Sequence, residues 1–121
     1  MLVVDDHEDT LKLVKDILEK EGYQVATASD RTEAISALAE EEFHLILLDI
    51  LLPGDNGWEL CIEIRKKFRD MKIAYLTVLK RSQYIERRGI DDLRKLKISD
   101  YIEKPFDNNM LLERISAILS Q

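Results

Sequence analysis

Five residues with side chains suited to phosphate chemistry stand at the ends of short apolar runs in the 121-residue sequence: Asp5, Asp6, Asp49, Thr77 and Lys104. Together they offer three carboxylates, a hydroxyl and an ammonium. Three neighbouring carboxylates repel one another, and one lysine would leave a net charge of about −2 at such a site. A hard divalent cation with oxygen ligands would complete the balance, and Mg²⁺ suits a site of two carboxylates, water and a substrate phosphate. The residue types therefore predict a magnesium site.

The same side chains are equipped for phosphoryl transfer. Asp49 would attack phosphorus, while Mg²⁺, Lys104 and Thr77 would hold the oxygens on which charge accumulates. No general base is needed, because an ionised carboxylate is already a nucleophile. The two histidines and one cysteine lie well apart in the sequence, which argues against a zinc or copper site.

Each of these residues also has an ordinary explanation. Asp5 and Asp6 could cap a following helix, Asp49 could open a turn, and Lys104 could be one of many solvated lysines. Their joint placement after apolar runs favours a shared site, because independent placement would scatter these residue types over helix surfaces.

The hydrophobic pattern predicts the elements that would position this set. Short apolar runs at 1–4, 24–28, 45–48, 72–76 and 99–102 predict five strands. Amphipathic segments between and after them predict five helices, with 79–98 the least regular and Gly89 a point where its helix could divide or end. Strands alternating with helices indicate an α/β fold, a doubly wound (βα)5 domain with a parallel sheet. Ligands bind such sheets at the carboxyl ends of the strands, where the five residues would meet.

Composition limits the class of protein. Apolar residues make up 45% and charged residues 35% of the chain, and glycine and proline total six, which excludes collagen-like and low-complexity sequences. The single Cys61 excludes a disulfide framework. No apolar run approaches the roughly 18 residues of a membrane helix, so we expect no membrane association and a cytoplasmic protein.

The net charge of −6 is unevenly divided along the chain. Residues 1–60 hold 4 basic and 15 acidic side chains, whereas 61–121 hold 14 basic and 9 acidic ones. Such a division is typical of a protein with two surfaces for different partners, although solvated helix faces that differ by chance would give the same totals.

Ordered motifs give the chain a specific resemblance. The sequences at 2–6 (LVVDD), 49–57 (DILLPGDNG) and 101–106 (YIEKPF), together with Thr77, resemble the receiver domain of two-component response regulators. The match runs from the first residue nearly to the last. It implies a chemotaxis-regulator-like fold with the flavodoxin-like strand order 2-1-3-4-5. We therefore expect one receiver domain over 1–121 and no effector domain in this chain.

The resemblance assigns roles around an acceptor aspartate. A sensor histidine kinase or a histidine phosphotransfer protein would donate a phosphoryl group from phosphohistidine to Asp49. Asp6, Asp49 and the backbone carbonyl of Leu51 would bind Mg²⁺, with Asp5 acting mainly through metal-bound water. Lys104 would bind the acyl phosphate. The protein would catalyse only its own phosphorylation and dephosphorylation, as a signalling switch rather than an enzyme.

The resemblance also implies a switch and an output surface. Thr77 would move toward the phosphoryl group and let Tyr101 turn inward. That movement would reshape the face formed by the fourth helix, fifth strand and fifth helix, where a downstream protein or effector domain would bind. Pro105 fits the cis peptide bond that the family often has after the lysine. The oligomeric state, including a homodimer, stays open.

Three features depart from the family pattern. Val78 replaces the usual small residue and would crowd the route to Asp49. Leu51 and Leu79 are apolar where polar side chains could position an attacking water, which predicts a long-lived acyl phosphate. The segment 80–97 looks about five residues longer than usual and carries a net charge of +4. It is either a basic output surface for an acidic partner or a solvated helix. Direct nucleic-acid binding is the weaker alternative, because Tyr84 is the only aromatic residue in the segment and the whole protein is acidic.

Two other functions compete with a phosphorylated switch. An aspartate-nucleophile phosphohydrolase would carry Asp-x-Asp on one strand, which is not the pattern here. A receiver-like protein-interaction module that does not use phosphorylation typically lacks an acidic residue or the lysine, whereas this chain has them all.

Overall fold

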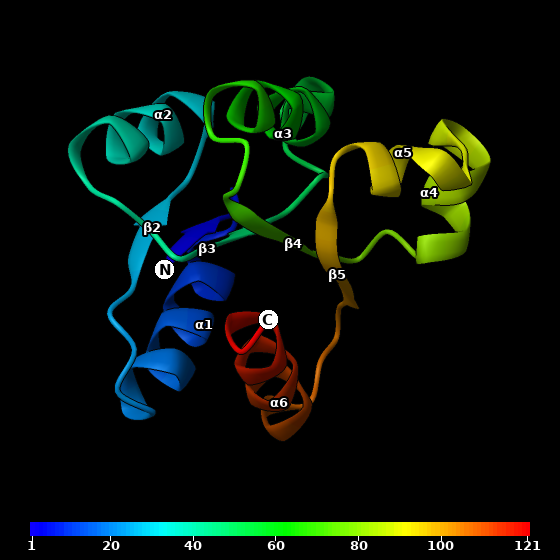
Figure 1. Cartoon of the computed structure of the whole chain (residues 1–121). Coiled ribbons are helices and arrows are strands. Elements are labelled where there is room, and N and C mark those ends of the chain that lie inside the picture. The colour runs from blue at the N-terminus through cyan, green and yellow to red at the C-terminus, as the bar shows by residue number, and fades with distance from the viewer.

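Five parallel strands form one sheet in the computed structural model, which describes residues 1–121 except for the side chain of Asp55. The strand order is β2-β1-β3-β4-β5, and the sheet runs through the middle of the molecule (Figure 1). The strands are β1 (Leu2–Val4), β2 (Ala26–Ala28), β3 (Leu45–Leu48), β4 (Lys72–Thr77) and β5 (Ile98–Glu103). The predicted doubly wound α/β class and its strand order are confirmed.

Helices cover both faces of this sheet (Figure 1). The helices are α1 (Glu8–Lys20), α2 (Arg31–Glu40), the short 3₁₀ helix η1 (Pro53–Asp55), α3 (Asn56–Lys67), α4 (Arg81–Arg88), α5 (Ile90–Lys95) and α6 (Asn108–Leu119). Helices α2 and α3 lie on one face and α1 and α6 on the other. Helices α4 and α5 lie beside β5 on the α2–α3 side, where Tyr84 and Leu93 pack into the same core. The sequence predicted five helices. A sixth α-helix is present because Gly89, at φ 86°, divides the fourth predicted helix into α4 and α5.

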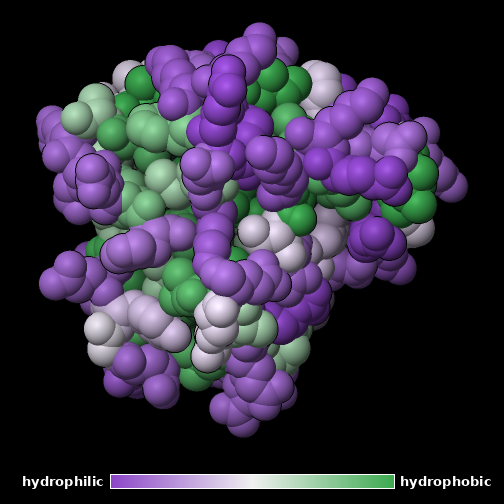
Figure 2. Space-filling view, viewed as in Figure 1, coloured by the Kyte–Doolittle hydropathy of each residue, from purple (hydrophilic) through white to green (hydrophobic). Residues whose placement is uncertain are grey.

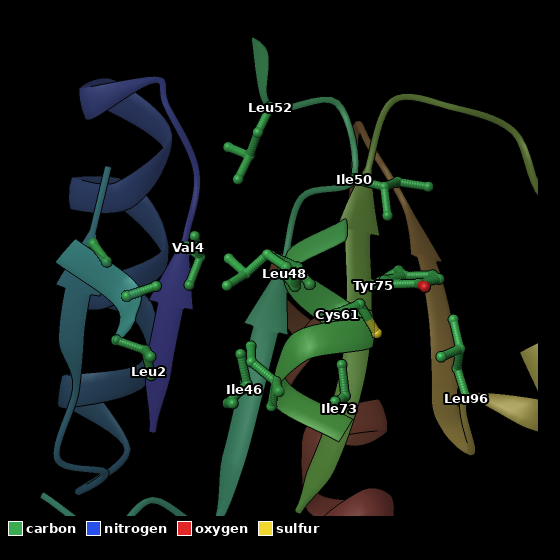
Figure 3. Packing of buried hydrophobic residues seen from close by; sticks show 14 of the residues in the cluster. Leu2, Val4, Ile46, Leu48, Ile50, Leu52, Cys61, Ile73, Tyr75 and Leu96 are labelled. Carbon is green, nitrogen blue, oxygen red and sulfur yellow. The ribbon is translucent and has the colours of Figure 1, made fainter. Parts of the chain in front are cut away.

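Strand alternation builds two hydrophobic cores, one on each side of the sheet. On β3, Ile46 and Leu48 face the α2–α3 side, whereas Leu45 and Leu47 face the α1–α6 side, and all four are fully buried. A strand buried on both faces reads as a continuous apolar run, as the sequence predicted. Figure 3 shows side chains of β1, β3 and β4 lined up beneath Cys61 of α3.

Local signals set the ends and faces of the helices. The side chain of Asp30 accepts a hydrogen bond from the backbone N–H of Glu33 at 2.8 Å, and the Glu33 carboxylate accepts one from the backbone N–H of Ser29 at 2.7 Å. A capping motif is thus present at the start of α2, and its return bond goes to the N–H one residue earlier than in the standard capping box. On α1 the buried stripe includes Leu11, Val14 and Leu18, which recur at helical spacing.

Polar side chains cover most of the visible surface, and hydrophobic atoms show mainly between the helices (Figure 2). On α1, Leu13 is a large apolar residue that is 51% exposed. None of the helices in the described part of the chain combines the length and apolarity that a bilayer crossing requires.

Candidate functional site

The sheet brings Asp5, Asp49, Thr77 and Lys104 to one edge. Val4 of β1 pairs with Leu48 of β3, so the aspartates that follow them emerge side by side. The Asp49 backbone N–H donates to the Val4 carbonyl at 3.0 Å, and the Lys104 backbone N–H donates to the Thr77 carbonyl at 2.8 Å. Parallel register therefore assembles residues that lie up to about a hundred positions apart in the sequence.

A buried cluster of charges occupies the centre of this edge. The Lys104 ammonium contacts Oδ2 of Asp5 and lies 3.2 Å from Oδ2 of Asp49. The three side chains are 12%, 2% and 4% exposed, respectively. Burying two carboxylates against one ammonium leaves a negative charge that is costly to desolvate. The cluster is therefore suited to an additional cation.

Backbone N–H groups fix the orientation of both buried carboxylates. Oδ1 of Asp49 accepts a hydrogen bond from the N–H of Leu51 at 2.9 Å, and Oδ1 of Asp5 accepts one from the N–H of His7 at 2.9 Å. Each carboxylate is thus held between a backbone donor on one oxygen and Lys104 on the other. Such preorganisation holds the Asp49 carboxylate in a fixed direction.

The donor set fits Mg²⁺. Asp5, Asp6, His7 and Asp49 each offer one ligand atom, and these atoms lie within 4.8 Å of one another. Three of the four are carboxylate oxygens, the ligand type that Mg²⁺ prefers, and the partly exposed Asp6 leaves the site open to water. The Leu51 residue contributes its N–H to Asp49, and a metal-binding role for its carbonyl stays a prediction.

Thr77 and Tyr101 lie beside the charged cluster in the buried part of the edge. Thr77 ends β4, is fully buried, and its Oγ1 accepts a 3.3 Å hydrogen bond from the N–H of Leu79. The Tyr101 hydroxyl donates to the Leu79 carbonyl at 2.7 Å. The backbone of Leu79 is thus hydrogen-bonded to both predicted switch residues, Thr77 and Tyr101.

Three tyrosine rings pack together at this point. Tyr101 lies edge-on to Tyr75 and Tyr84, with ring centroids 5.7 and 5.8 Å away. Burial raises the pKa of Tyr101 above its ordinary value, and the nearby carboxylates of Glu103 and Asp49 raise it further. The Tyr101 hydroxyl therefore stays protonated and acts as a neutral hydrogen-bond donor.

The sequence did not assign a role to Gly57 or to the contacts that dock α4 and α5. A Cβ atom on Gly57 would lie 2.4 Å from the Asp49 carbonyl oxygen, so only glycine lets α3 approach the acceptor loop this closely. Trp58 donates from Nε1 to Oδ2 of Asp92 at 3.0 Å, and Arg88 stacks 3.6 Å above its ring. The glycine was visible within the DILLPGDNG motif, whereas no local signal reveals the Trp58–Asp92 pair.

The remaining predicted features are placed as follows. The Lys104–Pro105 peptide bond is cis, as the resemblance implied. Val78 is 60% exposed, and Leu79 is buried in the core. Slow phosphorylation caused by Val78 and a long-lived acyl phosphate stay predictions.

Comparison with known proteins agrees with this geometry. The family model described as the response regulator receiver domain matches residues 1–116. The chain belongs to the response regulator receiver domain family. The family resemblance predicted from the motifs is therefore confirmed, and with it a place in two-component signal transduction.

Solved receiver structures show the same fold. TrrA from Thermotoga maritima, a response regulator solved in complex with Mg²⁺–BeF, is 34% identical, with a TM-score of 0.80 and coverage of 97% of this chain and 96% of that chain. A CheY-like receiver domain protein from Methanospirillum hungatei is 32% identical, with a TM-score of 0.85 and coverage of 98% and 91%. NtrX from Brucella abortus, solved with ATP, is 31% identical with a TM-score of 0.85, but the match covers 98% of this receiver and only 26% of that chain.

Proposed function

We propose that this receiver domain, spanning residues 1–121, is a switch that accepts a phosphoryl group onto Asp49 from the phosphohistidine of a sensor histidine kinase or histidine phosphotransfer protein. The observation that carries the proposal is the buried Asp49 carboxylate, held between the Leu51 N–H and the Lys104 ammonium at the carboxyl edge of the sheet. Because histidine kinases draw their phosphoryl group from ATP, we place the reaction in the cytoplasm.

The transfer needs few protein groups. A carboxylate oxygen of Asp49 forms a bond to phosphorus while the bond between phosphorus and the donor imidazole nitrogen breaks, and that nitrogen keeps the electron pair and takes up a proton. Lys104 lies 3.2 Å from Asp49 and can stabilise negative charge on the transferred group. Because both side chains are largely buried, the local dielectric is lower than that of water, which strengthens this interaction.

We propose Mg²⁺ as the cofactor, held by Asp6, Asp49 and the carbonyl of Leu51, with Asp5 acting through bound water. The carboxylate set of this chain fits the ion, and the Mg²⁺–BeF complex of the similar TrrA supports it. When bound, the ion supplies positive charge to phosphoryl oxygens.

Phosphorylation would be read out through Thr77 and Tyr101. Adding a doubly charged phosphoryl group at Asp49 changes the local charge, and the Thr77 hydroxyl, now bonded to Leu79, can turn toward it. Leu79 also anchors the Tyr101 hydroxyl, so a shift there biases the position of the tyrosine. The affected surface is formed by α4, α5, β5 and α6, where we propose that a downstream protein or effector domain binds.

Acetyl phosphate tests the acceptor without a cognate kinase. The protein is incubated with acetyl phosphate and Mg²⁺, and intact mass is followed for the wild type, for Asp49→Asn, and for the exposed control Asp16→Asn on α1. We expect one added phosphoryl group in the wild type and the control, and none in Asp49→Asn. Rapid turnover of acetyl phosphate without an adduct would indicate a phosphohydrolase, and no reaction would indicate an interaction module. Either result overturns the proposal.

A further inference from the structure

His7 lies against the carboxylate cluster, and the proposed phosphoryl transfer gives it no role. Its Nδ1 atom lies 3.2 Å from Oδ1 of Asp5 and 3.2 Å from Oδ1 of Asp6. The residue precedes α1, but its side chain makes no capping hydrogen bond to that helix within the described structure. Helix capping therefore does not account for the orientation of the imidazole.

The spacing of these atoms matches the spacing of ligands around one ion. Neighbouring ligands of a six-coordinate ion lie about 3 Å apart when each bond is about 2.1 Å long, and opposite ligands lie about 4.2 Å apart. The 3.2 Å distances from Nδ1 to the two carboxylates correspond to the first value. The ligand atoms of Asp5, Asp6, His7 and Asp49 all lie within 4.8 Å of one another.

The backbone holds His7 at this position. Its N–H donates to Oδ1 of Asp5 at 2.9 Å, so main chain and side chain both face the same carboxylate. The Nδ1 atom also forms a 3.2 Å hydrogen bond with Oδ1 of Asp5, and because a carboxylate oxygen only accepts, an ion bound at Nδ1 would displace that proton. The side chain is 70% exposed, which leaves the imidazole free of core packing and able to turn.

We infer that His7 is a metal ligand and that it makes this site selective for imidazole-binding divalent ions of the first transition row over Mg²⁺. The inference rests on the proposed metal site. Mg²⁺ prefers oxygen ligands and gains little from a nitrogen, whereas Ni²⁺ and Zn²⁺ bind imidazole well. Because carboxylates alone also bind Ni²⁺ more tightly than Mg²⁺, the diagnostic quantity is the effect of removing His7 on each ion.

The test is isothermal titration of the metal-free protein with MgCl₂ and with NiCl₂ at one fixed pH. We compare the wild type, His7→Ala, and His44→Ala, which removes the other histidine from an exposed position at the opposite end of the sheet. His7→Ala should weaken Ni²⁺ binding at least tenfold and change Mg²⁺ binding less than twofold. His44→Ala should change neither.

A second measurement reads the nitrogen directly. Bound Ni²⁺ shifts the ring protons of a coordinated imidazole far outside the normal proton NMR range, so wild-type protein should show such signals and His7→Ala should not. Their absence from the wild type, or their persistence in His7→Ala, would overturn the inference.

Two other outcomes have distinct meanings. If His7 acts only as a nearby positive charge, His7→Ala will tighten Mg²⁺ and Ni²⁺ binding alike, which also overturns the inference. Asp6→Asn separates this result from failure of the proposed metal site. If Asp6→Asn weakens Mg²⁺ binding but His7→Ala leaves Ni²⁺ binding unchanged, only the role of His7 is rejected. If Asp6→Asn leaves Mg²⁺ binding unchanged, the proposed metal site itself is rejected.

Discussion

Gly57 is the residue whose missing side chain shapes the acceptor loop. A Cβ atom there would lie 2.4 Å from the Asp49 carbonyl oxygen and 2.5 Å from Cα of Ile50, and neither backbone atom can move without displacing the loop. We therefore expect Gly57→Ala to lower the free energy of unfolding by about 3 kcal/mol, the upper range for overpacking. It should also slow the phosphorylation of Asp49 by acetyl phosphate.

Urea denaturation measures the stability change, and Gly22→Ala is the matched control. A Cβ atom on Gly22 would meet nothing within 4 Å, so that variant bears only the strain of its φ of +91°, about 1 kcal/mol. Equal losses in the two variants would show that the close approach to the loop carries no cost of its own.

At the scale of elements, α5 depends on its docking against α3. Six residues are too few for a helix to be stable alone, so tertiary contacts must hold it. Asp92 of α5 accepts hydrogen bonds from the Tyr84 hydroxyl and from Trp58 Nε1. Asp92→Ala removes the acceptor from two partly buried donors, and we expect a loss of about 2 kcal/mol in the free energy of unfolding.

The neighbouring Asp91 provides the control for this prediction. It is exposed and lies 3.7 Å from Arg94, so Asp91→Ala should cost no more than about 0.5 kcal/mol. Amide hydrogen exchange over 90–95 should accelerate in Asp92→Ala and not in Asp91→Ala. Exchange that stays at the wild-type rate in both variants would mean that other contacts hold α5.

These elements also show what the sequence could predict. The apolar runs located the strands, and parallel topology then determined that Asp5, Asp49 and Lys104 would meet, because strand ends share an edge. The docking of α5 could not be predicted from the sequence. Trp58, Tyr84 and Asp92 come from three different helices, and their contact depends on the direction that the chain takes at Gly89.

At the scale of the whole molecule, the fold brings together charged residues from the acidic and the basic halves of the sequence. Asp5 and Asp49 come from the strongly acidic first half, and Lys104 comes from the basic second half, yet they form one buried cluster. The ammonium offsets only part of the negative charge at this edge. Asp5 and Asp6 lie far from Asp49 in the sequence, and these carboxylates come together only in the folded protein. A cation that needs all of them therefore binds the folded state alone.

Mg²⁺ should therefore raise the melting temperature. At a concentration of a hundred times the dissociation constant, a ligand of the folded state adds about 2.7 kcal/mol. For a domain of this length we expect a rise of about 10 °C, measured by circular dichroism at constant ionic strength. Asp6→Asn should lose most of the rise, while its melting temperature without Mg²⁺ should stay equal or increase, because one fewer carboxylate relieves the repulsion. A rise of the same size in wild type and Asp6→Asn would place the stabilising ion elsewhere on the molecule.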